Sequence, residues 1–300
     1  MNKNPRVTFR IELFCLLIVL AECASARAAT VYLNNFDSGN ASINGLTIVD
    51  QSLGPPWSSV GVNADQLRIA PAGPWNTFVV ANTASFAAPY SAILKNNPGT
   101  VTWAFNVSNQ DSESYLNNGF FFCLGSDSMD PTRYTSSSYL LFGGAFVGNR
   151  MEFNGVGSGF PSTLLFEIPS ADGLGPLPSK GSFRITYEPS SDLWSVFGEV
   201  GSDYVDPTTV TSLLGSVVDS TYTGVPLSYM AFGGQYYGSD FFDNVSVSVV
   251  PEPSTIGFAF LATAAGFVPR LRIGSAQQTG RRQRRDRVSV DNGTSLARRA

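Results

Sequence analysis

The chain has 300 residues, and its 19 basic and 23 acidic residues give a net charge of −4 at pH 7. It contains no histidine, which excludes a serine–histidine catalytic triad and any zinc site that depends on histidine. Residues 30–249 hold six of the basic and 18 of the acidic residues, a net charge of −12 that argues against binding to nucleic acid.

The N-terminus has the order of a secretory signal peptide. Lys3, Arg6 and Arg10 precede an apolar core over residues 13–21, and small residues follow. These are the three parts of such a signal, so we assign residues 1–29 to it. Glu12 interrupts the apolar face, and an uncleaved N-terminal anchor is the alternative.

Cysteine is scarce in the remaining chain. Cys15 and Cys23 fall in the signal peptide, which leaves Cys123 without an intramolecular disulfide partner. Cys123 lies in the apolar run 119–125, so we expect a buried core residue there and not a nucleophile.

Residues 30–249 indicate a single all-β domain. Between residues 100 and 107, the large apolar residues Val101, Trp103, Phe105 and Val107 alternate with small or polar ones, the pattern of a half-buried strand. No segment of this region has a sustained helical period. The other strands predicted are 31–36, 46–49, 78–80, 139–142, 164–168, 183–187, 193–197, 229–232 and 243–249. About twelve short strands predict an antiparallel sandwich of two sheets.

The segments 183–187 and 193–197 flank a five-residue turn and predict a β-hairpin. Together with 139–144 and the closing strand 242–247, this hairpin resembles the laminin G or concanavalin A-like jelly roll. The resemblance implies a jelly-roll topology, and another β-sandwich is the alternative. Since such sandwiches serve as lectins, hydrolases and adhesion modules, the fold alone does not assign a function.

Hydrolases of the resembled fold commonly carry an E-x-D-x-x-E motif on one strand, and the chain has no such triplet. Glu152 has no acidic residue two or four positions later. We therefore assign no catalytic residue. An enzyme that degrades polysaccharide with carboxylates from distant strands remains an alternative.

Aromatic residues in loops suggest a carbohydrate site. Sugars stack on aromatic faces beside amide and carboxylate groups. The candidate residues are Trp57, Trp75, Tyr236, Tyr237 and Asp240. The alternative is that these aromatic side chains only close the open ends of the sandwich.

Two oxygen-rich loops, 109–113 and Asp127–Asp130, have ligand types that Ca²⁺ accepts. Asp and Asn are also ordinary turn residues. We therefore name calcium as a candidate cofactor without assigning a ligand.

The C-terminus begins with a proline-rich motif whose residues are Val250, Pro251, Glu252, Pro253 and Ser254. The prolines predict an extended and exposed linker. The apolar run 256–268 follows, and arginines come after it. As a helix, its 13 residues reach about 20 Å, less than the roughly 30 Å hydrocarbon core of a membrane.

This order resembles a PEP-CTERM sorting signal over residues 250–273, with a basic tail over 274–300. The resemblance implies that an exosortase in the inner membrane reads the motif, removes the hydrophobic helix and passes the protein to the cell surface or the extracellular matrix. The trailing arginines favour an orientation with the domain outside. A proline-rich linker before a disordered basic tail is the alternative.

The sequence therefore predicts an exported β-sandwich, held transiently in the inner membrane and then sorted to the envelope. We expect a non-catalytic structural or adhesive role, with exopolysaccharide as a partner. A lectin-like module and a polysaccharide-degrading enzyme are the alternatives.

Overall fold

In the computed structural model of this protein, the structure describes residues 28–51, 58–71, 76–109, 119–132, 136–144, 150–156, 163–168, 180–235 and 239–251. Most of the predicted signal peptide and all of residues 252–300 lie outside these ranges. Within them, no helix has the length and apolar character needed to span a membrane.

The described part of the chain consists of β-strands joined by turns and short 3₁₀ helices. The first strands are β1 (Ala29–Asn34), β2 (Thr47–Asp50), β3 (Ser59–Asn63), β4 (Gln66–Ala70) and β5 (Asn76–Asn82). The middle strands are β6 (Gly99–Asn109), β7 (Gly119–Ser126), β8 (Ser138–Gly144), β9 (Arg150–Val156) and β10 (Thr163–Ile168). The last are β11 (Lys180–Glu188), β12 (Leu193–Gly201), β13 (Leu213–Val218), β14 (Tyr229–Gln235) and β15 (Asp240–Pro251). The 3₁₀ helices are η1 (Gly39–Ile43), η2 (Thr83–Ser85), η3 (Leu94–Asn96) and η6 (Pro207–Thr209).

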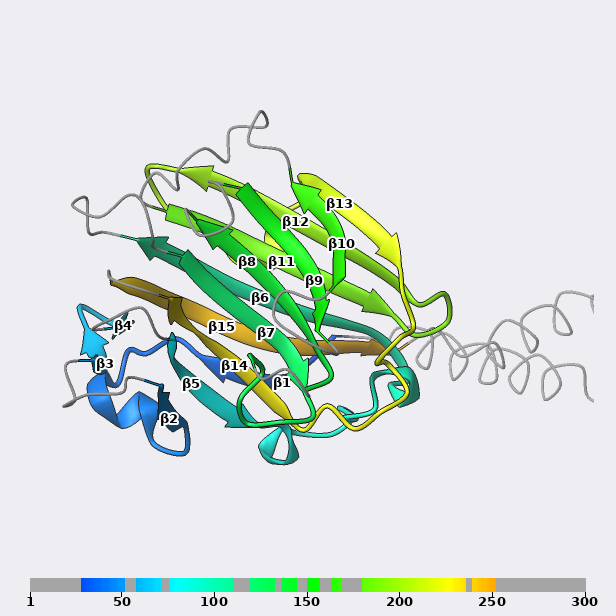
Figure 1. The fold of residues 1–300 in the computed structure, drawn as a ribbon, viewed down its shortest axis with the longest axis horizontal. Coiled ribbons are helices and arrows are strands. Elements are labelled where there is room, and N and C mark those ends of the chain that lie inside the picture. Colours follow the sequence, from blue (N-terminus) through cyan, green and yellow to red (C-terminus); the bar gives the residue numbers. More distant parts are fainter. Residues whose placement is uncertain are drawn as a thin grey trace, which may run out of the picture.

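These strands form two antiparallel sheets that pack face to face (Figure 1). Sheet A has the order β13-β12-β11-β6-β15-β4-β3, and β1 also pairs with β15. Sheet B has the order β10-β9-β8-β7-β14-β5-β2. Strands β7 to β10 are neighbours both in the sequence and in sheet B. The chain then forms β11 to β13 in sheet A before β14 returns to sheet B and pairs with β7, which is a Greek-key connection. The predicted two-sheet antiparallel sandwich is confirmed, and its connections are those of a jelly roll.

Alternation in the sequence places the core between the sheets. Val101, Trp103, Phe105 and Val107 of β6 are fully buried, as predicted. The Phe105 ring stacks on Phe122 of sheet B, with centroids 4.0 Å apart and planes 3° apart. Because rings from both sheets interdigitate, the two inner faces form one apolar core.

The predicted hairpin is also confirmed. Strands β11 and β12 pair from Lys180–Gly201 to Glu188–Leu193, and Asp192 closes their turn in the left-handed region with a φ of 52°. The core residues of β11, Phe183, Ile185 and Tyr187, are fully buried.

Sheet B is apolar on both faces. On β7, Phe120 and Phe122 belong to the main core, whereas Phe121 and Cys123 belong to a second cluster on the outer face. This explains why residues 119–124 form an uninterrupted apolar run. Cys123 is fully buried, as expected, and burial raises the pKa of its thiol.

Two parts of the sheets differ from the sequence prediction. Strands β3, β4, β9 and β13 are not among the predicted strands. The prediction of an exposed linker from residue 250 is wrong for Val250 and Pro251, which pair with Thr100 and Gly99 at the end of β15 and are half-buried. A proline is tolerated at a strand end, where its missing N–H interrupts no central ladder.

The close pairing of β14 with β5 predicts the effect of replacing Gly233. A Cβ there would meet the carbonyl oxygen of Thr77 and lie 2.6 Å from the Phe78 Cα, so the backbone would have to move. We expect Gly233→Ala to lower the free energy of unfolding in urea by at least about 1–3 kcal/mol. At Gly224 a Cβ would meet nothing within 4 Å, and Gly224→Ala should change the free energy of unfolding by less than about 1 kcal/mol. Equal effects of the two substitutions would contradict this account.

Candidate functional site

The three loops that carry the predicted sugar-binding aromatic residues begin and end at one end of the sandwich. Trp57, Trp75, Tyr236 and Tyr237 themselves lie outside the described residues. The strand residues that flank their loops are paired: Asp50 with Thr77, Asn76 with Gln235, and Ile69 with Asp240. We call this the loop end.

Asp240 is the one predicted sugar-binding residue that the structure describes. It begins β15, and the residue is only 2% exposed. Its carboxylate packs so closely over Gly234 that a Cβ there would collide with Oδ2. This burial argues against direct contact between Asp240 and a glycan.

Polar side chains tie the loop end together. The Arg68 guanidinium donates to Ser59 Oγ at 3.0 Å and to Ser239 Oγ at 2.8 Å, which connects β3, β4 and the residue before β15. Gln51 accepts from Asn76 Nδ2 at 3.0 Å and donates to Asp130 Oδ2 at 2.8 Å. These contacts fix the strand ends from which the loops leave.

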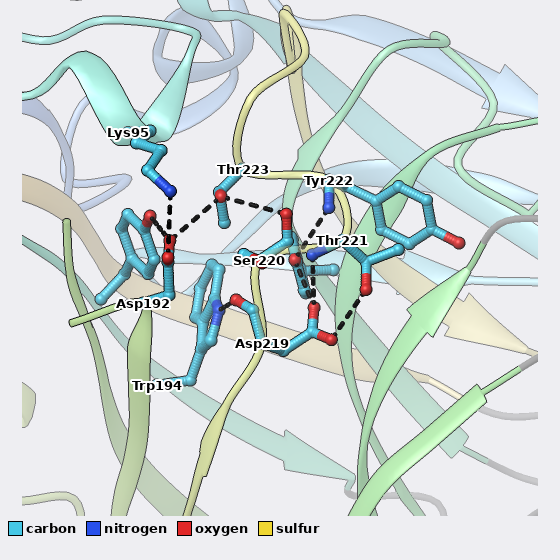
Figure 2. A network of polar contacts seen from close by, with 10 residues as sticks. Lys95, Asp192, Trp194, Asp219, Ser220, Thr221, Tyr222 and Thr223 are labelled. Carbon is cyan, nitrogen blue, oxygen red and sulfur yellow. Dashed lines mark hydrogen bonds and ion pairs between the residues drawn. The ribbon is translucent and has the colours of Figure 1, made fainter. Parts of the chain in front are cut away.

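The opposite end is where both ends of the described chain lie. Ala29 pairs with Val249, and Pro251 pairs with Gly99 (Figure 1). We call this the termini end. It contains a polar network built around two carboxylates, Asp192 from the β11–β12 turn and Asp219 from the β13–β14 connection (Figure 2).

Asp219 joins the two sheets. Its Oδ1 accepts from the Tyr139 hydroxyl of β8 at 2.6 Å and from the Thr221 N–H at 3.1 Å, and its Oδ2 accepts from the Thr221 hydroxyl at 2.8 Å. Its carbonyl oxygen accepts from Trp194 Nε1 at 3.1 Å. Burial and the bond to Asp219 raise the pKa of Tyr139, which keeps its hydroxyl a donor.

Asp192 joins three connections of the chain. Its Oδ1 accepts from the Tyr187 hydroxyl at 2.8 Å and from Thr223 Oγ1 at 3.3 Å, and its Oδ2 lies 3.1 Å from Lys95 Nζ. Burial acts to raise the pKa of Asp192, but the hydrogen bonds from Tyr187 and Lys95 and the charge of Lys95 outweigh it. The pKa therefore lies below its ordinary value.

The aromatic rings of the donors Tyr139, Tyr187 and Trp194 pack beneath this network. The rings of Tyr139 and Tyr187 lie 4.3 and 4.6 Å from Trp194, and Trp194 stacks on Trp103 at 5.9 Å. Trp103 and Trp194 are fully buried, which confirms their predicted place in the core. Each tyrosine thus has its ring in the core and its hydroxyl at the rim.

Every carboxylate oxygen of Asp192 and Asp219 accepts at least one hydrogen bond or ion pair from the protein. Such an arrangement closes the end of the sandwich and leaves these groups poorly suited to proton transfer with a substrate. The sequence analysis did not identify either residue. The spacing Asp-x-Thr could have identified Asp219 as a turn residue. In Asp219-Ser-Thr221, Asp130-Pro-Thr132 and Asp206-Pro-Thr208, the threonine N–H donates to the aspartate carboxylate two residues before it.

The candidate calcium loops lie partly within the described chain. Residues 110–113 of the first lie outside it. In the second, Asp127 accepts from the Ser137 N–H at 2.9 Å and Asp130 from the Thr132 N–H at 3.1 Å, so both carboxylates stabilise the turn. Among the described residues, no group of three Asp, Glu, His or Cys side chains could hold a metal ion.

No protein-family model and no curated protein matches this sequence. The chain is similar to many solved structures, including the following three. Arcelin-5, a lectin-like defence protein from Phaseolus vulgaris, shares 13% identity over 74% of this chain and 96% of its own, with a TM-score of 0.45. A Bauhinia forficata lectin in complex with GalNAc shares 10% over 74% and 98%, with a TM-score of 0.45. The catalytic domain of a GH131 β-glucanase from Podospora anserina shares 10% over 73% and 95%, with a TM-score of 0.46. Similarities this low say nothing about what this chain binds.

The lowered pKa of Asp192 predicts acid sensitivity. The carboxylate stabilises the fold above the ordinary aspartate pKa of about 3.9, and this contribution is lost as the pH falls through the lower folded-state value. We expect Asp192→Asn to reduce the free energy of unfolding near pH 7, and the difference from wild type to shrink below about pH 4. Urea denaturation of both proteins from about pH 7 to below about pH 4 measures this difference in the free energy of unfolding. The control is Asp203→Asn, whose carboxylate is 84% exposed. A difference for Asp192→Asn that stays constant with pH would refute the linkage.

Proposed function

We propose that this protein is exported and displayed at the cell envelope or in the extracellular matrix, where the sandwich has a non-catalytic structural or adhesive role in contact with polysaccharide. One observation carries the proposal. The predicted targeting segments adjoin the termini end, whereas the loops with the predicted sugar-binding aromatic residues belong to the loop end.

The geometry suits display. Strand β15 runs from Asp240 at the loop end to Pro251 at the termini end (Figure 1), and its 12 residues span about 40 Å when extended. The sorting motif would begin in the last rung of sheet A, with no spacer before it. A domain attached there would hold its loop end away from the membrane.

The non-catalytic part of the proposal is supported by the network at the termini end. Its two carboxylates, Asp192 and Asp219, serve tyrosine, threonine and lysine donors of the fold. The sequence also lacks histidine and the paired-carboxylate motif sought above. These observations favour a binding or structural role over hydrolysis.

The glycan part of the proposal rests on Trp57 and Trp75, each of which follows a proline that limits the motion of its loop. We expect the full chain to bind glycans on an array, tested with calcium and with a chelator, and Trp57→Ala or Trp75→Ala to weaken this binding at least tenfold. The control is Leu164→Ala, which alters an apolar side chain that is 47% exposed on β10. Saturable binding to one defined sugar would identify a lectin-like module. Release of reducing ends from the polysaccharide would contradict a non-catalytic role.

Sorting is tested independently of binding. In a host with an exosortase, Glu252→Ala should leave the full-length chain in the inner membrane, because the acidic residue between two prolines distinguishes the motif. Glu199→Ala removes an exposed acidic side chain of β12 and should leave release unchanged. Gel mobility and membrane fractionation measure the processing of each variant. Normal processing of the Glu252 variant would refute the sorting proposal.

A further inference from the structure

Six hydroxyl side chains form one row across the outer face of sheet A. Strand pairing places them side by side from one edge of the sheet to the other. In order they are Ser216, Ser195, Thr186, Thr102, Ser248 and Thr30, from β13, β12, β11, β6, β15 and β1. We call this set the hydroxyl row.

The row faces solvent. The residues before and after Thr186 and Thr102, such as Ile185 and Trp103, are fully buried in the core, so alternation turns the hydroxyls outward. Thr30 and Ser216 are exposed, and the four between them are partly exposed. None of the six side chains makes a hydrogen bond to another described residue, so their donors and acceptors are available to a partner.

The spacing of the row is set by the backbone. Adjacent strands lie about 4.8 Å apart, so six strands place the outermost hydroxyls about 24 Å apart. The hydroxyls therefore repeat once per strand. The distance between neighbouring hydroxyls is of the same order as the length of one sugar unit in an extended chain. A polymer lying across the strands could therefore meet the row repeatedly.

The rows on either side contain exposed apolar side chains together with two charged ones, Arg184 and Glu188. On the side of the loop end, Leu213 is 58% exposed and Leu33 is 64% exposed, whereas the Arg184 guanidinium covers the Phe197 ring at 4.1 Å. On the side of the termini end, Val218 is 68% exposed. Unlike a hydrated acidic surface, such a face can contact the apolar sides of sugar rings while its hydroxyls bond to their edges.

Charge selects among polymers. The row itself is neutral, and the domain around it has 18 acidic against six basic residues, which disfavours anionic polymers such as nucleic acid or uronic acid chains. We propose that the hydroxyl row binds a neutral polysaccharide chain lying across the strands of sheet A. This inference rests on the proposed function for its setting, but it concerns a face of the domain separate from the loop end.

The test is affinity electrophoresis of the full chain in gels that contain hydroxyethyl cellulose, a neutral polymer, or alginate, an anionic one. The double substitution T102V/T186V removes two adjacent hydroxyls and keeps β-branched side chains. The control T47V/T163V makes the same changes at exposed positions on β2 and β10 of sheet B. We expect hydroxyethyl cellulose to retard the wild type and the control, and the row variant to bind at least fivefold more weakly. Equal urea midpoints for the two variants establish that both remain folded.

Several results would overturn the proposal. One is that hydroxyethyl cellulose does not retard the wild type. The others are that alginate retards the wild type as much as hydroxyethyl cellulose does, and that the two double variants bind hydroxyethyl cellulose equally. Self-association of the wild type that T102V/T186V abolishes, measured by sedimentation, would assign the face to a second copy of the chain. Loss of retardation only in Trp57→Ala or Trp75→Ala would leave the proposed function standing and remove the hydroxyl row from it.

Discussion

The packing of aromatic rings between the two sheets is the interaction on which the rest of the structure depends. Phe105 of sheet A stacks on Phe122 of sheet B at 4.0 Å, and nearer the termini end Trp194 of sheet A packs against Tyr139 of sheet B at 4.3 Å. Because these rings come from both sheets, their contacts set the distance between the sheets. They also orient Tyr139 and Tyr187 so that their hydroxyls reach Asp219 and Asp192 at the rim. The apolar core and the polar network are therefore one continuous structure.

That continuity gives the two ends of the domain different characters. At the termini end, side chains from both sheets and three connections converge on two carboxylates (Figure 2). At the loop end, Arg68 and Gln51 hold the strand ends in place, and the connections between these strands contain the aromatic residues predicted to bind sugars. An end that is closed by internal bonds, opposite an end from which longer loops leave, is the division that the proposed display role requires.

Much of the fold follows from local patterns in the sequence. Period-two alternation identified the inward face of β6, and the turn between Tyr187 and Leu193 identified the β11–β12 hairpin. Strands such as β13 escaped detection because Gly215 interrupts their pattern. That glycine is needed where the Phe166 ring of β10 packs against β13. The strand character of Pro251 and the roles of Asp192 and Asp219 depend on partners far away in the sequence, which local patterns do not identify.

The place of β15 has a consequence for the order of events in the life of the chain. This last strand lies inside sheet A, where it pairs with β6 along its length and with β4 and β1 on its other side. Strand β1 thus finds its neighbour only when residues 245–249 have been synthesised. Until then three strand edges stay open, and the ring stack that includes Phe242 is incomplete. Sheet A therefore cannot close before β15 is available, and in a chain exported as proposed this delay would keep the domain unfolded until its C-terminal strand had crossed the membrane.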